Sequence, residues 1–192
     1  MARIIETRKQ KKPVITLIGE GLTEQYYFKH IRTLYNYHYN VKPYFFGTTS
    51  LFEMDRKINE ILEGGGIAIC VFDTDVSQRI EAEKKKLNSL LRKYGKKKNV
   101  IFCDSLPSVE YWFLLHFQNT NKYFIDSKAV EMELKSFLSN YDKKTVFLEK
   151  ERWVSILCGD NKLENAIQRA KAFGTTGASY SNIHKAFEKF RE

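Results

Sequence analysis

The first half of the chain alternates between short apolar runs and amphipathic segments, and this alternation restricts the folds open to it. Residues 14–18, 67–72 and 99–103 are nearly continuous apolar runs, which is typical of strands covered on both faces. The run at 41–46 predicts a further strand, placed at an edge or a strand start because it contains Pro43. Strands that alternate with helices in units of about thirty residues form right-handed crossovers in a parallel sheet. We therefore expect an α/β core with a four-stranded parallel sheet flanked by helices.

Capping residues mark where the helices between these strands begin and end. Thr23 is placed to cap a helix whose apolar side chains recur every three or four residues. Ser50 and Glu53 form a capping box before a second helix, which the glycines at 64–66 end. Residues 77–94 predict a highly charged third helix, which Gly95 ends.

The character of the chain changes near residue 106, where alternation gives way to helical patterns without a strong further strand. Helices are expected around residues 107–117, 127–140, 146–157, 161–173 and 181–191. We predict a basic N-terminal arm at 1–12, an α/β core at 13–105 and a helical portion at 106–192 that packs on the core.

The charge balance indicates which class of partner the protein attracts. Among 192 residues, 32 Lys and Arg oppose 23 Asp and Glu, which leaves a formal charge of +9 and favours nucleic acid as a partner. The longest apolar run is too short to span a bilayer, and the first residues lack the apolar stretch of a secretory signal. Three unpaired cysteines, without metal-binding spacing, suit reduced thiols. We expect a cytoplasmic protein that does not bind membranes.

Acidic residues follow two of the predicted strands at the points where the strands end. Glu20 stands between two glycines after the first strand, and Asp73 and Asp75 follow the run at 67–72. If these strands are neighbours, as in the doubly wound order 2-1-3-4, the three carboxylates meet at the edge where open parallel sheets bind ligands. Such hard oxygen ligands suit Mg²⁺ or Mn²⁺. Each residue alone is also compatible with capping a helix or facing solvent, but the three together favour a metal site.

A Glu after the first predicted strand and an Asp-x-Asp after the third resemble the Toprim pattern of topoisomerases, primases and OLD-type nucleases. Longer blocks resemble the RloB-like family, whose members occur beside restriction and abortive-infection systems. The resemblance covers residues from about 14 to 190. Its blocks are GEGLTEQYYF at 19–28, VFDTD at 71–75, LPSVEYWFLLHF at 106–117, AIQRA at 166–170 and NIHKAFE at 182–188.

The resemblance implies a Toprim-like, Rossmann-like fold and a metal-dependent phosphodiesterase, a nuclease, used in anti-phage defence. It also implies Glu20, Asp73 and Asp75 as ligands of Mg²⁺ or Mn²⁺, with Glu110 as a further catalytic acid. Two departures weaken the match of the later blocks. Leu106 stands where many relatives have Asn, and their C-terminal Asn-Pro-Ser/Thr element is here ASYSN at 178–182.

Several further residues have both a functional and a structural interpretation. Glu24 either helps to hold a second metal ion or favours the positive end of the first helix, with the structural role slightly ahead. Glu110 either faces the site or pairs with a buried base such as His116, and the family block favours the site. We expect His116 to be an interior histidine with satisfied hydrogen bonds and His184 to be exposed. The aromatic residues at 111–113 and 117 predict core rather than a base-stacking platform.

Basic residues concentrate on the charged helix and in the loop that follows it. A charge run is usually a solvated face, but this one follows the candidate metal strand directly and suits the tracking of a phosphate backbone. The N-terminal arm adds further basic residues, among them Arg8 and Lys12. The candidate nucleic-acid-binding residues are Lys84, Lys85, Lys86, Arg92, Lys93, Lys96, Lys97 and Lys98.

Two other functions stay open at this point. An apolar strand followed by Asp-x-Asp also opens HAD-type phosphatases, in which Asp73 would be the nucleophile, Asp75 the acid/base and Asp160 a metal ligand. A non-catalytic adaptor that binds nucleic acid or a partner protein of a defence system is the other alternative. A homodimer is compatible with a Toprim-type nuclease, and Lys171 is a candidate for stabilising developing charge.

Overall fold

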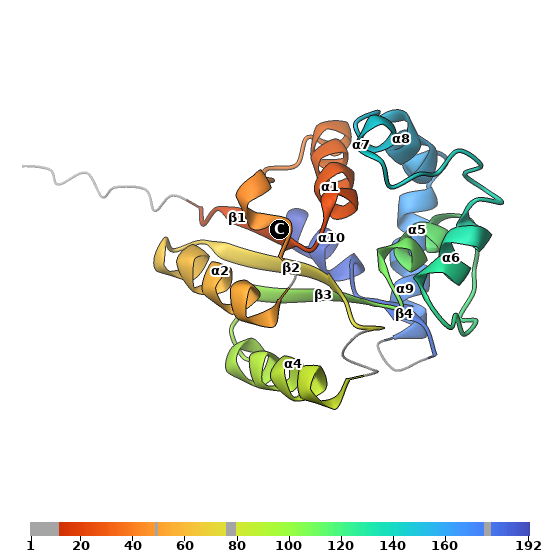
Figure 1. The fold of residues 1–192 in the computed structure, drawn as a ribbon. Coiled ribbons are helices and arrows are strands. Elements are labelled where there is room, and N and C mark those ends of the chain that lie inside the picture. Colours follow the sequence, from red (N-terminus) through yellow and green to blue (C-terminus); the bar gives the residue numbers. More distant parts are fainter. Residues whose placement is uncertain (1–11, 49, 76–79, 175–177) are drawn as a thin grey trace, which may run out of the picture.

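A four-stranded open sheet forms the centre of the molecule (Figure 1). The computed structural model describes residues 12–48, 50–75, 80–174 and 178–192. The strands lie in the order β1-β2-β3-β4, with β1 parallel to β2, β2 parallel to β3, and β3 antiparallel to β4. Their bounds are β1 Ile15–Gly19, β2 Ile67–Asp73, β3 Val100–Leu106 and β4 Tyr180–Ser181. The expected α/β class is confirmed, and so is the pairing of the strands that precede Glu20 and Asp73.

The prediction of a strand at 41–46 is wrong. Residues Pro43–Phe45 form a short 3-10 helix, η1, and just before it the chain pairs with β1 through an isolated bridge between Thr16 and Asn40. Pro43 lacks the N–H that a ladder needs, and Phe45 and Phe46 are buried in the core. The sheet is therefore mixed, because its fourth strand is the antiparallel β4 of two residues, which lies where the sequence predicts no strand.

Helices cover both faces of the sheet. Helix α2, Leu51–Glu63, packs on β1 and β2 and against α4, Glu81–Tyr94. On the other face α10, His184–Phe190, packs on β3. Helix α1, Leu22–Tyr35, joins α10 through ring contacts of Phe28 with Phe187 and Phe190. The predicted helix at 77–94 is confirmed from residue 81, and residues 76–79 lie outside the described part of the chain.

The remaining helices gather beyond the carboxyl ends of the parallel strands (Figure 1). The segments expected at 127–140 and 146–157 contain shorter helices than the patterns predict. Helix α10 and strand β4 come from the same C-terminal half yet lie against β3, so this half helps to build the central sheet. The bounds are α5 Val109–Phe117, α6 Ser127–Leu134, α7 Thr145–Leu148, α8 Arg152–Cys158 and α9 Lys162–Phe173.

Helix α5 is the centre of this helical portion. Its residues from Val109 to His116 are all buried, and it contacts α6, α8 and α9 as well as β3 and β4. Trp112 is fully buried and its Nε1 donates a hydrogen bond to the Tyr27 hydroxyl at 2.8 Å, which ties α5 to α1. The prediction that the aromatic residues 111–113 belong to the core is confirmed. No helix in the described part of the chain is long and apolar enough to cross a membrane.

Candidate active site

The turn after β1 is built so that Glu20 and Glu24 project from the carboxyl end of the sheet. The ring of Phe46 packs over Gly19, where an added Cβ would lie 2.6 Å from a ring carbon, so a larger residue would displace the ring. Helix α1 begins at Leu22 with Gly21 as its N-cap, two residues before the predicted cap Thr23. The Glu24 carboxylate accepts a hydrogen bond from the Gly21 N–H at 3.0 Å. The structural role weighed for Glu24 is therefore present.

The turn after β2 is fixed by its middle residue. Thr74 is buried, and both its N–H and its hydroxyl donate to the Ser105 carbonyl on β3, at 2.9 and 3.1 Å. The Tyr180 hydroxyl lies 3.4 Å from that of Thr74 and donates to Asp104 at 2.9 Å. Tyr180 belongs to the ASYSN segment, so the element that departs from the family pattern still braces the turn between Asp73 and Asp75.

Five carboxyl groups act on one another at this edge of the sheet. The pKa of Asp73 is raised well above its ordinary value, first by burial and then by the charges of Glu24, Glu110, Glu20 and Asp75. Burial and the neighbouring Glu24 raise the pKa of Glu20 to about 7. Burial and the charge of Glu110 raise the pKa of Glu24 to about 7. The structure thus brings together every acid that the sequence analysis proposed for the site.

One oxygen of Asp73 stands out within this cluster. The Oδ1 atom is enclosed and has no hydrogen-bond partner among the described residues, although the side chain as a whole is half-buried. A buried carboxylate oxygen that makes no hydrogen bond is costly unless a cation or a proton satisfies it. Asp73 is therefore the centre of the candidate site.

Glu110 differs from the other acids because it is fully satisfied by its neighbours. It is 1% exposed and accepts hydrogen bonds from the Ser108 hydroxyl at 2.6 Å and the Tyr141 hydroxyl at 2.9 Å. The Lys143 ammonium lies 2.8 Å from the same oxygen that Tyr141 contacts. Glu110 does not pair with His116, whose Nδ1 lies 2.7 Å from the Leu157 carbonyl. The arrangement makes Glu110 an anchor for Lys143.

In the described part of the chain, Lys143 is the cation that lies against these acids, and the sequence analysis missed it. It lies between α6 and α7, and it is half-exposed while Glu110 is buried. Burial opposes the charge of Lys143, but Glu110, Glu131 and Asp73 outweigh that effect, so its pKa is raised. Nothing in the local sequence distinguishes Lys143 from Lys144 beside it. Only the fold, which brings this loop to α5, identifies it.

The other candidates lie away from the cluster. Asp160, the metal ligand of the phosphatase alternative, is 92% exposed and pairs with Lys162 at 3.3 Å. Lys171 pairs with Glu188 at 2.8 Å, between α9 and α10. The prediction that His184 is exposed is wrong, since it is 8% exposed and packs in α10. His116 is interior as expected, but its Nε2 has no partner among the described residues.

The donor atoms of the cluster fit a hard divalent cation. Carboxylate oxygens are the protein ligands that Mg²⁺ and Mn²⁺ prefer, and Asp73 offers an unsatisfied one. In the described part of the chain, no three His, Cys, Asp or Glu side chains already form a finished metal-binding group. A cation would therefore have to draw the carboxylates of Glu20, Asp73 and Asp75 together.

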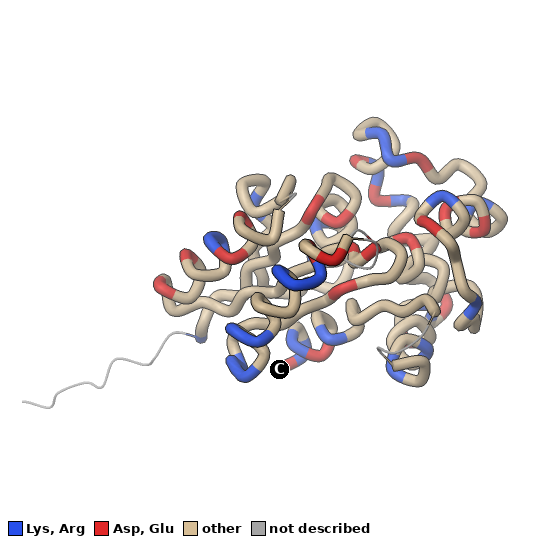
Figure 2. The backbone as a smooth tube through the Cα atoms, turned by 60° about the horizontal axis from the view of Figure 1, so that its bottom comes forward, with Lys and Arg blue, Asp and Glu red and all other residues tan. Residues whose placement is uncertain are grey.

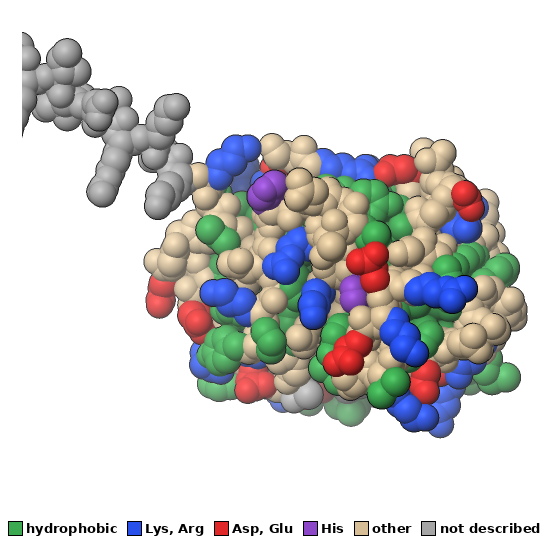
Figure 3. All heavy atoms as spheres, turned by 90° about the horizontal axis from the view of Figure 1, so that it is seen from above, with side chains coloured by type: hydrophobic (Ala, Val, Ile, Leu, Met, Phe, Trp, Pro, Cys, Tyr) green, Lys and Arg blue, Asp and Glu red, His purple; other side chains and the backbone are tan. Residues whose placement is uncertain are grey.

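The candidate nucleic-acid-binding residues lie on a different surface. All eight basic side chains from Lys84 to Lys98 are exposed, and they follow one helix and its exit loop (Figure 2). Lys86 pairs with Glu83 and Lys93 with Asp55, each at 2.7 Å. The face seen from above mixes basic, acidic and hydrophobic side chains (Figure 3). Residues 1–11 of the basic arm lie outside the described part of the chain.

The fold and the site together define a class: an α/β protein with an acidic cluster at the carboxyl edge of a mostly parallel sheet. The family model of RloB-like proteins matches residues 15–189, which is most of the chain. The chain therefore belongs to the RloB-like family. No curated protein and no solved structure is significantly similar to it.

Proposed function

We propose that the protein is a Mg²⁺- or Mn²⁺-dependent nuclease of the Toprim type that acts in anti-phage defence. The observation that carries the proposal is the convergence of Glu20, Glu24, Asp73, Asp75 and Glu110 around a buried, unsatisfied oxygen of Asp73. Membership of the RloB-like family supports it. The protein has a formal charge of +9, yet it concentrates carboxylates in one half-buried place. Such a cluster is suited to hold a cation that in turn binds a phosphate.

The electrostatics of the cluster explain why a divalent cation belongs there. Five carboxylates in a partly desolvated site cannot all stay ionised, and Lys143 supplies only one compensating charge. Protons fill part of the deficit, as the raised pKa values of Glu20 and Glu24 indicate. A bound divalent cation would take the place of those protons and would balance the negative charge of the ionised carboxylates.

Each residue has a distinct role in the proposed mechanism. Glu20, Asp73 and Asp75 would hold the cation, with Glu24 at the side of Glu20. When bound there, Mg²⁺ or Mn²⁺ would supply polarisation of the scissile phosphate and a lowered pKa for a bound water. Lys143 stabilises the negative charge that develops on the phosphate oxygens, and Glu110 positions Lys143 through the 2.8 Å contact.

A nuclease assay tests the proposal. Purified protein is incubated with RNA, single-stranded DNA and duplex DNA in Mg²⁺, Mn²⁺ or EDTA. Asp73→Asn should lower the metal-dependent rate about a thousandfold, because a ligand of a catalytic metal is worth several kcal/mol in the transition state. Asp160→Asn is the matched control, since Asp160 is exposed and its positive φ of 52° suits Asn.

The outcomes separate the alternatives. Loss of activity in Asp73→Asn with full activity in Asp160→Asn supports the proposal. Loss of the metal-dependent activity in both variants supports the HAD-type alternative instead, because only that alternative uses Asp160. Cleavage that persists in EDTA, or that Asp73→Asn leaves intact, contradicts the proposed site. Nucleic-acid binding without cleavage of any substrate favours the non-catalytic adaptor.

A further inference from the structure

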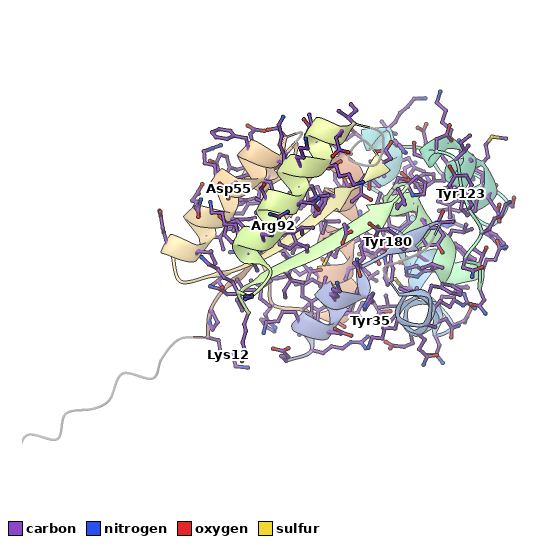
Figure 4. The ribbon with its side chains drawn as sticks, turned by 90° about the horizontal axis from the view of Figure 1, so that it is seen from below. Lys12, Tyr35, Asp55, Arg92, Tyr123 and Tyr180 are labelled. Atoms are coloured by element: carbon purple, nitrogen blue, oxygen red, sulfur yellow. The ribbon has the colours of Figure 1, made fainter. Side chains whose placement is uncertain are left out.

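A groove runs between α2 and α4 on the outer side of the sheet, where the two helices lie side by side and carry Asp55 and Arg92 (Figure 4). Its volume is about 490 Å³. Apolar side chains and lysines share its walls, which is unusual for a surface that only faces solvent. The lining residues are Leu51, Phe52, Asp55, Lys85, Lys86, Ser89, Leu90 and Lys93.

Phe52 is the feature that calls for an explanation. Its side chain is 80% exposed, more than any other large hydrophobic side chain in the described part of the chain. It stands in the first turn of α2, one residue after Leu51, which is packed against the core. An aromatic ring held by a helix in this way offers a flat face to a ligand.

The charges around Phe52 favour a polyanion. Lys85, Lys86 and Lys93 line the groove, and the basic row continues along α4 into the loop at 96–98. From Lys84 to Lys93 the row spans about 14 Å at the helical rise, long enough for at least two nucleotides. The ion pairs of Lys86 and Lys93 are exposed, so an incoming phosphate can displace their carboxylate partners at little cost.

We propose that this groove binds single-stranded nucleic acid, with an unpaired base stacked on Phe52 and the flanking phosphates on the lysines of α4. The proposal rests on the nuclease function proposed above and names its substrate class. A duplex keeps its base faces covered by stacking, so it can use the lysines but not the ring. An unpaired base of any identity presents a π-face that stacks on an aromatic side chain.

The residues that line the groove argue against a peptide helix as its ligand. An amphipathic helix needs several apolar anchors at i, i+3 or i+4, and i+7. The groove offers one exposed ring, because Leu90 is 6% exposed and already packed in the core. The basic row also runs beyond the groove, which suits an extended strand.

The chain enters both helices of the groove from the end of the sheet where the acids gather. Phe52 stands four residues after Thr48, whose N–H donates to the Gly19 carbonyl at 3.1 Å, next to Glu20. Helix α4 likewise begins after the turn that carries Asp73 and Asp75. The first turn of α2, which carries Phe52, therefore begins on the side of the sheet that carries the acids.

Fluorescence anisotropy tests the proposal with 5′-labelled 12-nucleotide single-stranded DNA and RNA and the matching duplexes, in EDTA at 0.1 M salt. Phe52→Leu should weaken single-strand binding about tenfold and leave duplex binding nearly unchanged. Phe52→Trp should preserve the affinity because it keeps an aromatic face. Met132→Ala, on α6, is the control for loss of an exposed apolar side chain.

A spectroscopic readout accompanies the binding assay. The natural tryptophans Trp112 and Trp153 are buried, so the added indole of Phe52→Trp is the exposed one in the described part of the chain. Its fluorescence should be quenched by single strands and far less by duplexes. Equal binding of single strands by wild type and Phe52→Leu overturns the proposal, as does capture of an acidic helical peptide in place of nucleic acid.

The experiments distinguish a failure of the proposed groove from a failure of the proposed nuclease function. Ring-dependent binding of single strands without cleavage upholds the groove and contradicts the nuclease. Cleavage that depends on Asp73 but is indifferent to Phe52→Leu upholds the nuclease and contradicts the groove.

Discussion

The carboxyl edge of the sheet is acidic and partly buried, whereas the outer face of α2 and α4 is basic and exposed to solvent. At the edge five acids lie together, two of them buried and three half-buried, and their charges raise the pKa values of Glu20, Glu24 and Asp73. On the outer face eight basic residues are exposed, and water and salt screen each of them. Burial, not the number of charges, decides how strongly a single residue acts. The edge should therefore respond to the substitution of a single charged residue, and the basic row of the outer face only to the substitution of several.

Among the basic residues, Lys143 should give the largest effect of a single substitution, and this effect tests the comparison. It is the cation held against the buried acids, and its partner Glu110 is 1% exposed. Lys143→Met should lower the cleavage rate about a hundredfold, the usual cost of removing one preorganised charge donor. Binding of single strands in EDTA should stay unchanged, because the groove lies on α2 and α4.

The matched control for this prediction is Lys171→Met. Lys171 is about as exposed as Lys143 and also pairs with a glutamate, but that pair lies between α9 and α10. Equal losses in the two variants would show that general charge, and not the position of Lys143, determines the rate. Lys143→Arg should retain part of the activity, since it keeps the charge near Glu110.

The sequence was sufficient to predict the acids but not the groups that hold them. Glu20, Asp73 and Asp75 follow apolar strands, and parallel strands end at a common edge, so their convergence follows from local pattern and topology. Lys143 and Tyr141 reach Glu110 only because a loop between two short helices folds back on α5. Contacts between positions thirty residues apart leave no local pattern.

The errors in the fold have the same origin. The run at 41–46 is apolar because Phe45 and Phe46 fill the core, a requirement that a 3-10 turn meets as well as a strand does. Strand β4 has two residues, too few to show alternation. Phe52 was not singled out because one apolar residue in a helix has no pattern to mark it as exposed.

The pH dependence of the free energy of unfolding tests the comparison further, because the acids of the edge have shifted pKa values and should change this free energy between pH 5 and 8. In the metal-free protein the pKa values of Glu20 and Glu24 are about 7, above their ordinary value of 4.5. The native state therefore binds more protons than the unfolded state between these values. The stability due to this effect is present below pH 4.5 and is lost as the pH rises through 7. Urea unfolding in EDTA from pH 5 to 8 measures it, and Glu20→Gln should flatten the profile.

His116 contributes an opposing slope that the same experiment must separate. Burial lowers its pKa to about 3, so the folded state excludes a proton that the unfolded state binds below pH 6.5. This effect removes about 2 kcal/mol of stability by pH 5. In a His116→Asn background, which keeps a donor near the Leu157 carbonyl, the decline with rising pH should be steeper. A profile that does not change in either variant contradicts the assignment.

The smallest expected effect comes from the outer face. Lys85→Gln combined with Lys86→Gln should weaken single-strand binding only a few-fold at 0.1 M salt, because each exposed lysine neutralises about one phosphate in a screened environment. The informative quantity is the salt dependence, measured as log Kd against log salt from 0.05 to 0.3 M. Its slope should fall by about 1.4, since each phosphate contact on a single strand contributes about 0.7. The double variant Lys128→Gln with Lys135→Gln, on and just after α6, is the control. An unchanged slope in the α4 variant would show that the phosphates bind elsewhere. A reduced slope, with an unchanged cleavage rate at saturating substrate, would show that the outer face binds the strand and that the carboxyl edge cleaves it.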